Sequence, residues 1–277
     1  MFADCHIHMV LDGKNWKSAI GRHAESPCRE AVEQTLSVFQ QQGYTYLRDG
    51  GDRWGAGALA RKLAPKYGIT YRTPLTPLCK AGHYGKFIGT SFGSLQEYAD
   101  LVRQNRENGA DFIKIMISGL MDFDRFGVLT EEGLEPEEIR EMIHIAHEEG
   151  MSVMAHANGA NVVEAAALAG CESVEHGAYL NGDAMCAMEE AGTVWVPTLS
   201  TIGNLLGKGR FREDQVEQIL ESALSNLEQY RGLVAPGSDS GAWAVFHGAH
   251  TEEALLNRAG ITPERMEQGI ARIQEKF

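Results

Sequence analysis

The chain has 277 residues, of which 43% are hydrophobic, so it is long enough for one large domain with a sizeable buried core. Its formal net charge is −13 and it has no long run of lysine and arginine, which argues against a nucleic-acid-binding protein. It has no stretch of roughly 18 apolar residues for a membrane span, no signal-like N-terminus, and five scattered cysteines without a C-x-x-C motif. We therefore expect a cytoplasmic protein that binds neither nucleic acid nor membrane.

Strand-like and helix-like segments alternate along almost the whole chain. Short apolar runs predict strands near residues 3–9, 44–48, 70–76, 111–117, 151–156, 172–176, 193–197 and 233–238. Each is followed by a helical pattern, near residues 29–42, 54–66, 94–108, 136–149, 160–169, 182–191, 212–230 and 250–274. Gly260 divides the last pattern in two. Eight strand–helix units predict an α/β fold with parallel strands, namely a TIM-like (β/α)8 barrel in which residues 1–277 form a single domain.

The first predicted strand ends in His6-Ile7-His8. Residues two apart in a strand point to the same face, so the two imidazoles are expected to converge. Two imidazoles placed in this way can chelate one metal ion. The H-x-H pattern alone is weak evidence for a metal site, because two histidines with a structural role in the core or a loop explain it more often.

Three further polar residues stand where predicted strands stop and loops begin: His156, His176 and Asp239. Active sites of barrel enzymes are built at these strand ends. Any one of the three could be a helix cap or a turn residue. Together with the first two histidines, however, they predict side chains from four strand ends that meet in one mouth.

Lys114 lies inside the predicted fourth strand, and a lone lysine in an apolar strand is costly unless it is paired. An edge lysine whose ammonium group reaches solvent is the ordinary alternative. An ammonium group would repel metal ions, whereas a carbamylated lysine supplies a carboxylate that can bridge two of them. The surrounding histidines therefore favour a carbamylated lysine.

This order of residues resembles the binuclear branch of the amidohydrolase superfamily. Finer segments are similar to the imidazolonepropionase and prolidase-like group, which includes metal-dependent Xaa-Arg carboxypeptidases. These segments are Arg48-Asp49-Gly50-Gly51, Lys114-Ile115-Met116, His156-Ala157, Glu175-His176-Gly177, Val196-Pro197-Thr198 and Gly237-Ser238-Asp239-Ser240-Gly241. Members of this group usually carry a small β-sandwich built from both termini. Because the H-x-H motif begins at residue 6, we expect a barrel without this sandwich.

The resemblance implies a site for two divalent metal ions. The H-x-H histidines and the aspartate would hold one ion, the two later histidines would hold the other, and the carbamylated lysine would bridge them. Zinc suits the nitrogen and oxygen ligands best, with manganese, iron and cobalt as alternatives. The predicted metal ligands are His6, His8, Lys114, His156, His176 and Asp239.

The same resemblance implies hydrolysis of an amide bond by a hydroxide that bridges the metals, since metal ions lower the pKa of bound water to near 7. Asp239 would accept the proton of this hydroxide and pass it to the leaving amine. The predicted catalytic residues are Asp239, His176 and Lys114.

Four residues are predicted to contact the substrate. His83 and Tyr84 lie in a glycine-flanked turn after the third strand, Tyr179 follows the sixth strand, and His247 follows the eighth. The alternatives are a solvent-exposed loop for His83 and simple packing for Tyr179.

The expected substrate is a small-molecule amide such as a peptide, an N-acyl amino acid or a cyclic amide. Lactonase or esterase chemistry at the same two metals is an alternative. So is a mononuclear deaminase, although Lys114 argues against it. A homo-oligomer is compatible with the sequence, and a degenerate barrel that only binds ligands is disfavoured because all six metal residues are present.

Overall fold

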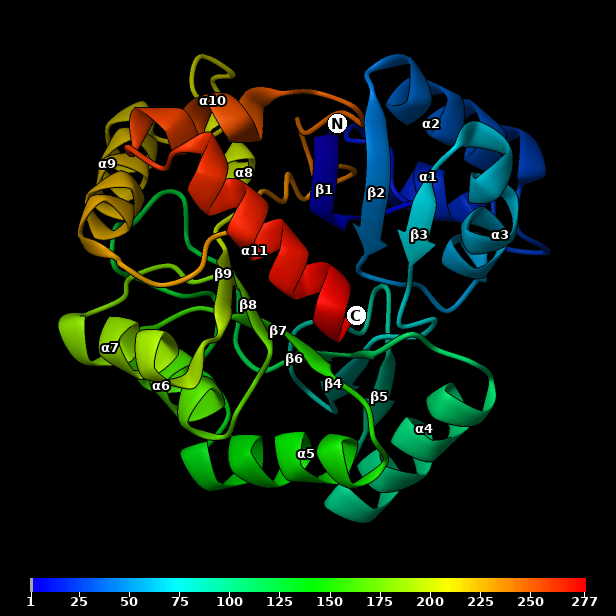
Figure 1. The fold of residues 1–277 in the computed structure, drawn as a ribbon, viewed down its shortest axis with the longest axis horizontal. Helices are drawn as coiled ribbons and strands as arrows, with labels where there is room; N and C mark the ends of the chain where they lie inside the picture. The colour runs from blue at the N-terminus through cyan, green and yellow to red at the C-terminus, as the bar shows by residue number, and fades with distance from the viewer. Residues whose placement is uncertain (1) are drawn as a thin grey trace.

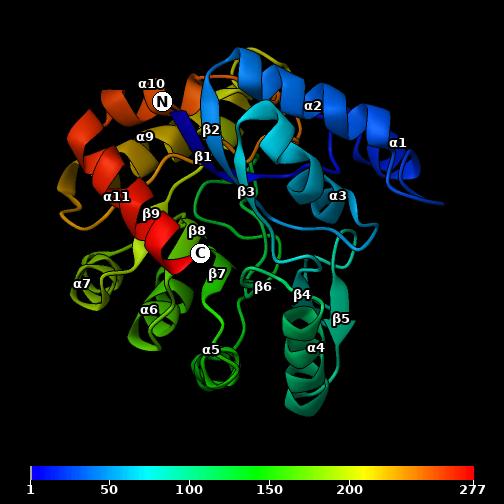
Figure 2. The same ribbon diagram turned by 45° about the vertical axis from the view of Figure 1, so that its right-hand side comes forward.

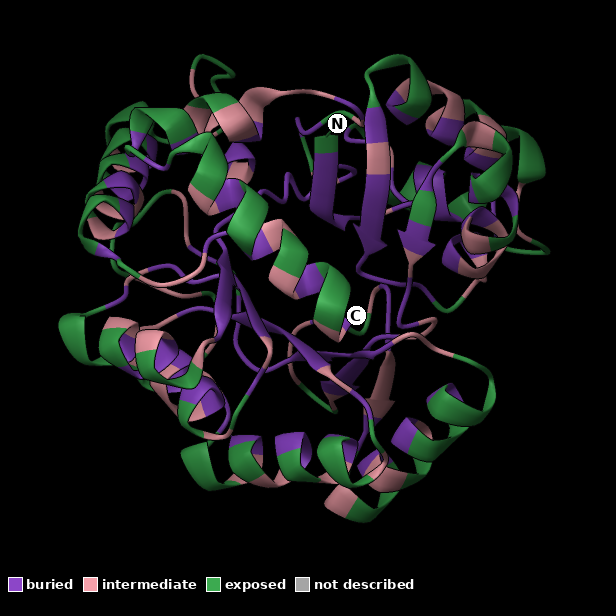
Figure 3. Ribbon diagram, in the orientation of Figure 1, coloured by how far each residue is buried: buried purple, intermediate pink, exposed green. Residues whose placement is uncertain are grey.

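The computed structural model describes residues 2–277, in which helices surround a core of parallel strands (Figure 1). The strands are β1 (Phe2–Ile7), β2 (Tyr44–Asp49), β3 (Thr70–Arg72), β4 (Leu78–Lys80), β5 (Thr90–Phe92), β6 (Ile113–Met116), β7 (Val153–Ala157), β8 (Ser173–His176) and β9 (Val194–Val196). The helices are α1 (Trp16–Gly21), α2 (Arg29–Gln41), α3 (Ala56–Leu63), the 3-10 helix η1 (Ala64–Tyr67), α4 (Leu95–Glu107), α5 (Pro136–Glu148), α6 (Ala160–Leu168), α7 (Gly182–Ala191), α8 (Ser200–Gly203), α9 (Glu213–Gln229), α10 (Thr251–Arg258) and α11 (Pro263–Lys276). Most strand residues are buried, whereas the helices expose one face (Figure 3).

The strands form two parallel sheets that together make the barrel wall. One sheet has the order β1-β2-β3 and the other the order β5-β4-β6-β7-β8-β9. The backbone N–H of Asp111, just before β6, donates to the carbonyl oxygen of Thr73, just after β3, at 3.0 Å. This hydrogen bond joins the two sheets at their first seam.

Residues 233–240 close the second seam, between β9 and β1. On one side the N–H of Ala235 donates to the carbonyl of Trp195 at 3.0 Å, and on the other the N–H of Cys5 donates to the carbonyl of Pro236 at 2.8 Å. The sequence predicted a regular eighth strand here, but this segment pairs with its neighbouring strands only through isolated bridges, Trp195 with Val234 and Ile7 with Ser240. Pro236 has no N–H to donate, which interrupts the hydrogen-bond ladder.

The (β/α)8 fold class predicted from the sequence is confirmed, and the observed helices follow the predicted ones closely. The last helical pattern is divided as expected, into α10 and α11, on either side of Gly260. The short strands β4 and β5 and the short helices α1, α8 and η1 were not predicted, because three to six residues are too few to show a period. None of the helices described in residues 2–277 has both the length and the apolar character needed to cross a membrane.

Helix α5 illustrates how the sequence produces the outer ring. Pro136 occupies the first turn, where its missing N–H has no intrahelical partner to lose. Ile139, Met142, Ile143 and Ala146 recur at the spacing of one helical face, and all four are buried against the barrel. The packing of such apolar faces on the strands holds each helix in place.

Helix α11 closes the end of the barrel at which the strands begin. It lies across the strands in Figure 1, and Figure 2 shows it beside the starts of β1 and β9. Phe277, the residue that follows α11, packs edge-on against Phe112 with 5.1 Å between ring centroids. The guanidinium carbon of Arg48 lies 4.4 Å from the centroid of the Phe277 ring. The opposite end, where the strands stop, is therefore the one left for a functional site.

Candidate metal centre

His6, in β1, and His8, just after β1, converge on Asp239, at the end of the eighth barrel segment. The Nε2 atom of His8 lies 3.2 Å from the Oδ1 atom of Asp239, and that of His6 lies 3.6 Å from the same oxygen. One ligand atom from each of the three residues lies within 4.8 Å of the others. The pairing of β1 with β2 changes register between Asp4 and Ile7, which is the stretch that contains His6. These three side chains can hold one metal ion.

Glu175, on β8, fixes the orientation of His6. Its Oε2 atom lies 2.7 Å from Nδ1 of His6, and its Oε1 atom accepts a hydrogen bond from Arg48 at 2.8 Å. Burial alone would raise the pKa of Glu175, but Arg48 and His6 lower it to about 2. An ionised Glu175 keeps a proton on Nδ1 of His6 and leaves the Nε2 lone pair free.

His156 and His176, at the ends of β7 and β8, lie against each other with 4.4 Å between ring centroids. In each ring, one nitrogen already has a protein partner. Nε2 of His156 lies 3.2 Å from the carbonyl oxygen of Gly119, and Nδ1 of His176 lies 2.7 Å from the hydroxyl of Thr198. The remaining nitrogens are Nδ1 of His156 and Nε2 of His176, which can bind a second ion.

Burial keeps three histidines of the cluster, His6, His156 and His176, neutral. Together with the charge of Lys114, it lowers the pKa of His6 to about 4 and that of His156 to about 3. Burial and the neighbouring histidines lower the pKa of His176 well below its ordinary value. Neutral imidazole is the form that binds a metal ion.

Two residues of the cluster have unusual backbones. His176 has φ of +69° and Asp239 has φ of +56°, in the left-handed region that costs non-glycine residues of the order of 1 kcal/mol or more. The backbone N–H of Asp239 donates to the carbonyl of His6 at 2.7 Å, which holds the aspartate against β1. Such conformations persist at functional sites because the surrounding fold enforces them.

Lys114 reaches the same place from β6. The residue is 3% exposed, and its Nζ atom has no hydrogen-bond partner. Burial lowers the pKa of Lys114 to about 8. An unpaired ammonium group in a buried site is costly. The unpaired Nζ atom of Lys114 therefore indicates that a bound ion or a covalent modification, which the polypeptide alone does not supply, completes the site.

The six predicted ligands line one pocket at the ends of the strands. Two more buried atoms there lack a hydrogen-bond partner, namely Nδ1 of His8 and Oδ1 of Asp239. The donor set of imidazole nitrogens and carboxylate oxygen fits divalent zinc or a related ion. The pocket is lined by His6, His8, Gly50, Pro77, Tyr84, Gly85, Phe87, Ile88, Lys114, Met116, Leu120, His156, His176 and Asp239.

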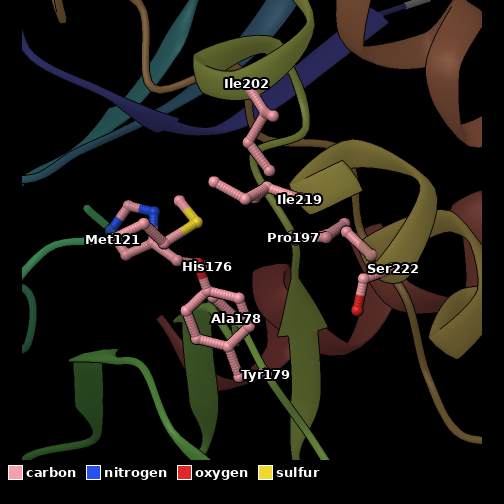
Figure 4. Close-up of a pocket in the computed structure, with 9 residues that line it drawn as sticks. Met121, His176, Ala178, Tyr179, Pro197, Ile202, Ile219 and Ser222 are labelled. Carbon is pink, nitrogen blue, oxygen red and sulfur yellow. The ribbon is translucent and has the colours of Figure 1, made fainter. Parts of the chain in front are cut away.

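Of the four residues predicted to contact the substrate, two line a cavity at this end of the barrel and two do not. Tyr84 lines the pocket, with its ring 4.9 Å from that of His156. Tyr179 lines a neighbouring cavity that also contains His176 (Figure 4). His83 lies outside both cavities, with Nδ1 3.7 Å from Glu131. His247 also lies outside them and contacts the carbonyl of His8 through Nε2 at 3.1 Å.

Sequence reasoning did not identify Glu175 and Arg48 as parts of the site, although both stood in segments that carried the family resemblance. The sequence did contain a signal for both residues: each is a charged residue within an apolar strand, where it is expected to be buried and therefore to need a partner. Two glycines were also missed. A Cβ at Gly50 would collide with the ring of His8, and one at Gly237 would lie 2.9 Å from Cβ of His6. Both positions need glycine so that the histidines can lie close to the backbone.

A family model described as the Amidohydrolase family matches residues 2–237, which is most of the chain. The chain belongs to the amidohydrolase family. This membership confirms the amidohydrolase family expected from the sequence.

Among curated proteins, this amidohydrolase is similar to ochratoxinase from Aspergillus niger, with 25% identity over 271 residues. That match covers 84% of the chain, which spans 55% of the length of ochratoxinase. Among solved structures, a Xaa-Pro dipeptidase with bound methionine aligns over 99% of this chain and 72% of its own, with a TM-score of 0.74 and 22% identity. The crystal structure of A. niger ochratoxinase aligns over 95% of this chain and 68% of its own, with a TM-score of 0.76 and 22% identity. These structures share the barrel fold with this chain.

Proposed function

We propose that this amidohydrolase cleaves an amide bond in a small molecule with the help of two divalent metal ions. The observation that carries the proposal is the convergence of six side chains from five segments of the barrel wall on one pocket, with buried atoms that have no partner in the protein. Divalent ions bound there would lower the pKa of water toward 7 and polarise the substrate carbonyl.

The protein's own groups have distinct roles in this proposal. His6, His8 and Asp239 hold one ion, with ligand atoms within 4.8 Å of one another. His156 and His176 hold the other through their remaining nitrogens. Zinc fits these donors, and manganese, iron and cobalt are the alternatives.

Lys114 is proposed to carry a carbamate that bridges the two ions. Its neutral amine would attack carbon dioxide, forming a C–N bond and releasing one proton. Because burial lowers the pKa of Lys114 to about 8, a substantial share of the amine is neutral near physiological pH. The carbamate would also neutralise the positive charge in the pocket.

Asp239 is proposed as the group that accepts a proton from the attacking water and delivers it to the leaving nitrogen. Its carboxylate remains ionised, because His6 and His8 lower its pKa against the opposing effect of burial. Its Oδ1 atom has no hydrogen-bond partner and lies within the pocket.

Metal content and hydrolysis test this function together. We expect about two divalent ions per chain by elemental analysis, and release of free amine from dipeptides or N-acyl amino acids in the metal-loaded protein. Asp239→Asn should retain most of the metal and lose turnover. The surface variant His144→Ala, on α5, is the control.

Other outcomes would redirect the proposal. Cleavage of lactones or esters in preference to amides would favour the alternative hydrolase. One ion per chain with ammonia release would favour a mononuclear deaminase. No metal after incubation with zinc or manganese and bicarbonate would contradict the metal centre itself.

A further inference from the structure

A row of aromatic side chains leads from the metal pocket to the surface. The ring of Tyr84 lies 4.9 Å from that of His156, and the ring of Phe87 lies 5.7 Å from that of Tyr84. Trp16, on α1, lies edge-on to Phe87 at 5.7 Å. Trp16 is 48% exposed, so the aromatic row of Tyr84, Phe87 and Trp16 begins at a proposed metal ligand and ends in solvent.

Most of the exposed large apolar side chains lie on segments at the same end of the barrel as the metal pocket. Of the seven large hydrophobic residues that are exposed in the described chain, five lie on segments that follow barrel strands: Trp16, Leu120, Phe126, Trp243 and Phe246. Segments that follow parallel strands emerge at the carboxyl end of the barrel, which is the end that holds the metal pocket. A substrate that approaches the metal pocket from this end therefore meets exposed apolar side chains.

A second apolar cavity lies on the other side of His176. The side chains of Met121, Ile202 and Ile219 converge in it, next to the His176 ring (Figure 4). Pro197 and Ala178 complete much of its lining. This cavity is smaller than the metal pocket, so it suits a small apolar group.

We infer that the substrate is an amide with a large aromatic group on one side of the scissile bond and a small apolar group on the other. The large group lies along the aromatic row, and the small group enters the cavity beside Met121 and Ile219. A bond positioned at the metal pocket lies between these two surfaces, because His176 lines both cavities. The inference rests on the proposed function and names the substrate class of that site.

The aromatic row fits a substrate because it is continuous with the catalytic pocket. Its inner members, Tyr84 and Phe87, are pocket-lining residues, and only Trp16 is largely exposed. Aromatic rings favour offset or edge-to-face contacts with other rings at this spacing, and such contacts discriminate between aromatic and aliphatic groups.

The test compares three neutral amides with metal-loaded protein. N-acetyl-L-alaninamide is the reference, N-(2-naphthoyl)-L-alaninamide carries the ring on the acyl side, and N-acetyl-L-alanine 2-naphthylamide carries it on the amine side. We expect at least one naphthyl amide to have a kcat/KM about tenfold or more above the reference. Equal values for all three amides would overturn the inference while leaving amide hydrolysis intact.

Variants locate the effect on the aromatic row. Trp16→Ala and Phe87→Ala should each lower the ratio of kcat/KM for the naphthyl amide to that for the reference by roughly three- to tenfold. Leu168→Ala, a 70% exposed apolar residue on α6, is the matched control and should leave the ratio unchanged. Ile219→Ala enlarges the small cavity and should favour leucine over alanine in the naphthoyl compound.

A binding measurement separates this inference from the proposed function. If no amide is hydrolysed, calorimetric titration of the metal-free protein with 2-naphthamide still tests the aromatic row. Binding that is weakened by Trp16→Ala and not by Leu168→Ala supports the inference. Absence of 2-naphthamide binding contradicts the inference. So does a dimer that forms as the protein concentration rises and shields the fluorescence of Trp16 from a quencher, because Trp16 would then be covered by a second copy of the chain.

Discussion

His6 illustrates how one side chain is oriented for the metal ion that we propose. Its Nδ1 atom lies 2.7 Å from the ionised Glu175, while its Nε2 atom faces Asp239. Glu175 in turn is held by Arg48, whose other nitrogens donate to the carbonyl of Cys5 and to the hydroxyl of Ser173. The imidazole therefore has a fixed ring orientation and a fixed protonation pattern before any ion is bound.

Glu175→Gln is predicted to weaken metal binding through His6. The amide keeps the size of the side chain but removes the charge that retains a proton on Nδ1 of His6. We expect metal affinity to fall roughly 10- to 100-fold, measured by competition with a chelator. Glu148→Gln, at an exposed position of α5, is the control. Unchanged affinity in a folded Glu175→Gln protein would show that Glu175 is only a packing residue.

Lys114→Ala is predicted to remove metal and activity together, because the residue has no other partner in the pocket. Short carboxylic acids such as propionate should restore part of both, since they can occupy the space left by the side chain and supply a carboxylate. Metal per chain and amide hydrolysis are the measurements, and Lys62→Ala on the exposed face of α3 is the control. Full activity in Lys114→Ala would exclude the carbamate bridge.

At the scale of elements, a buried carboxyl group connects α10 to α8. Glu252, in the first turn of α10, accepts hydrogen bonds from the backbone N–H groups of Leu199 at 3.0 Å and Ser200 at 2.7 Å. Burial raises the pKa of Glu252 from its ordinary value of 4.5 to about 8, although these hydrogen bonds oppose the shift. The folded protein thus holds a proton that the unfolded chain releases.

This shift predicts a pH dependence of stability. Between about pH 4.5 and pH 8 the folded state binds more protons than the unfolded state at Glu252, so the free energy of unfolding falls as pH rises. The stabilisation is fully present below pH 4.5 and is lost as pH rises through about 8. Glu252→Gln should make the pH dependence of the denaturation midpoint shallower across this window, whereas the exposed Glu217→Gln should not. A steeper dependence in Glu252→Gln would contradict the prediction.

At the scale of the molecule, the two ends of the barrel differ: one is packed with apolar side chains, and the other carries the proposed functional site. The end where strands begin is filled by apolar side chains and covered by α11, with Phe277 packed on Phe112 and under Arg48. The end where strands stop carries the metal pocket and the aromatic row. Stability and function are therefore separable by position along the barrel axis.

Phe277→Ala tests this separation. Removing a buried aromatic side chain is expected to lower the free energy of unfolding by about 3 kcal/mol, measured by denaturant titration. Metal per chain and kcat/KM of the folded variant should remain near those of the parent protein, because Phe277 does not line the metal pocket. A loss of metal without a loss of stability would show that the two ends are coupled.

The sequence by itself determined the barrel and the six side chains proposed as ligands. Eight alternations of apolar run and amphipathic helix are local patterns, and the residue that ends each strand can be read from the same local pattern. His6, His8, His156, His176 and Asp239 were found in this way, Lys114 was found as a lone lysine inside an apolar strand, and the structure brings all six to one pocket. Their roles as metal ligands stay predictions.

The tertiary structure alone decided which residues support and surround that pocket. Glu175 meets His6 across 169 positions of sequence and Arg48 across 127, and no local period encodes such pairs. The aromatic row likewise joins α1 to the segment after β4, and the eighth strand is irregular because of Pro236. Strand and helix periods arise from the geometry of neighbouring residues, whereas these contacts depend on how the barrel closes. For that reason the sequence predicted the fold and the proposed ligands, and the structure supplied the contacts that support these ligands and the surfaces proposed to bind the substrate.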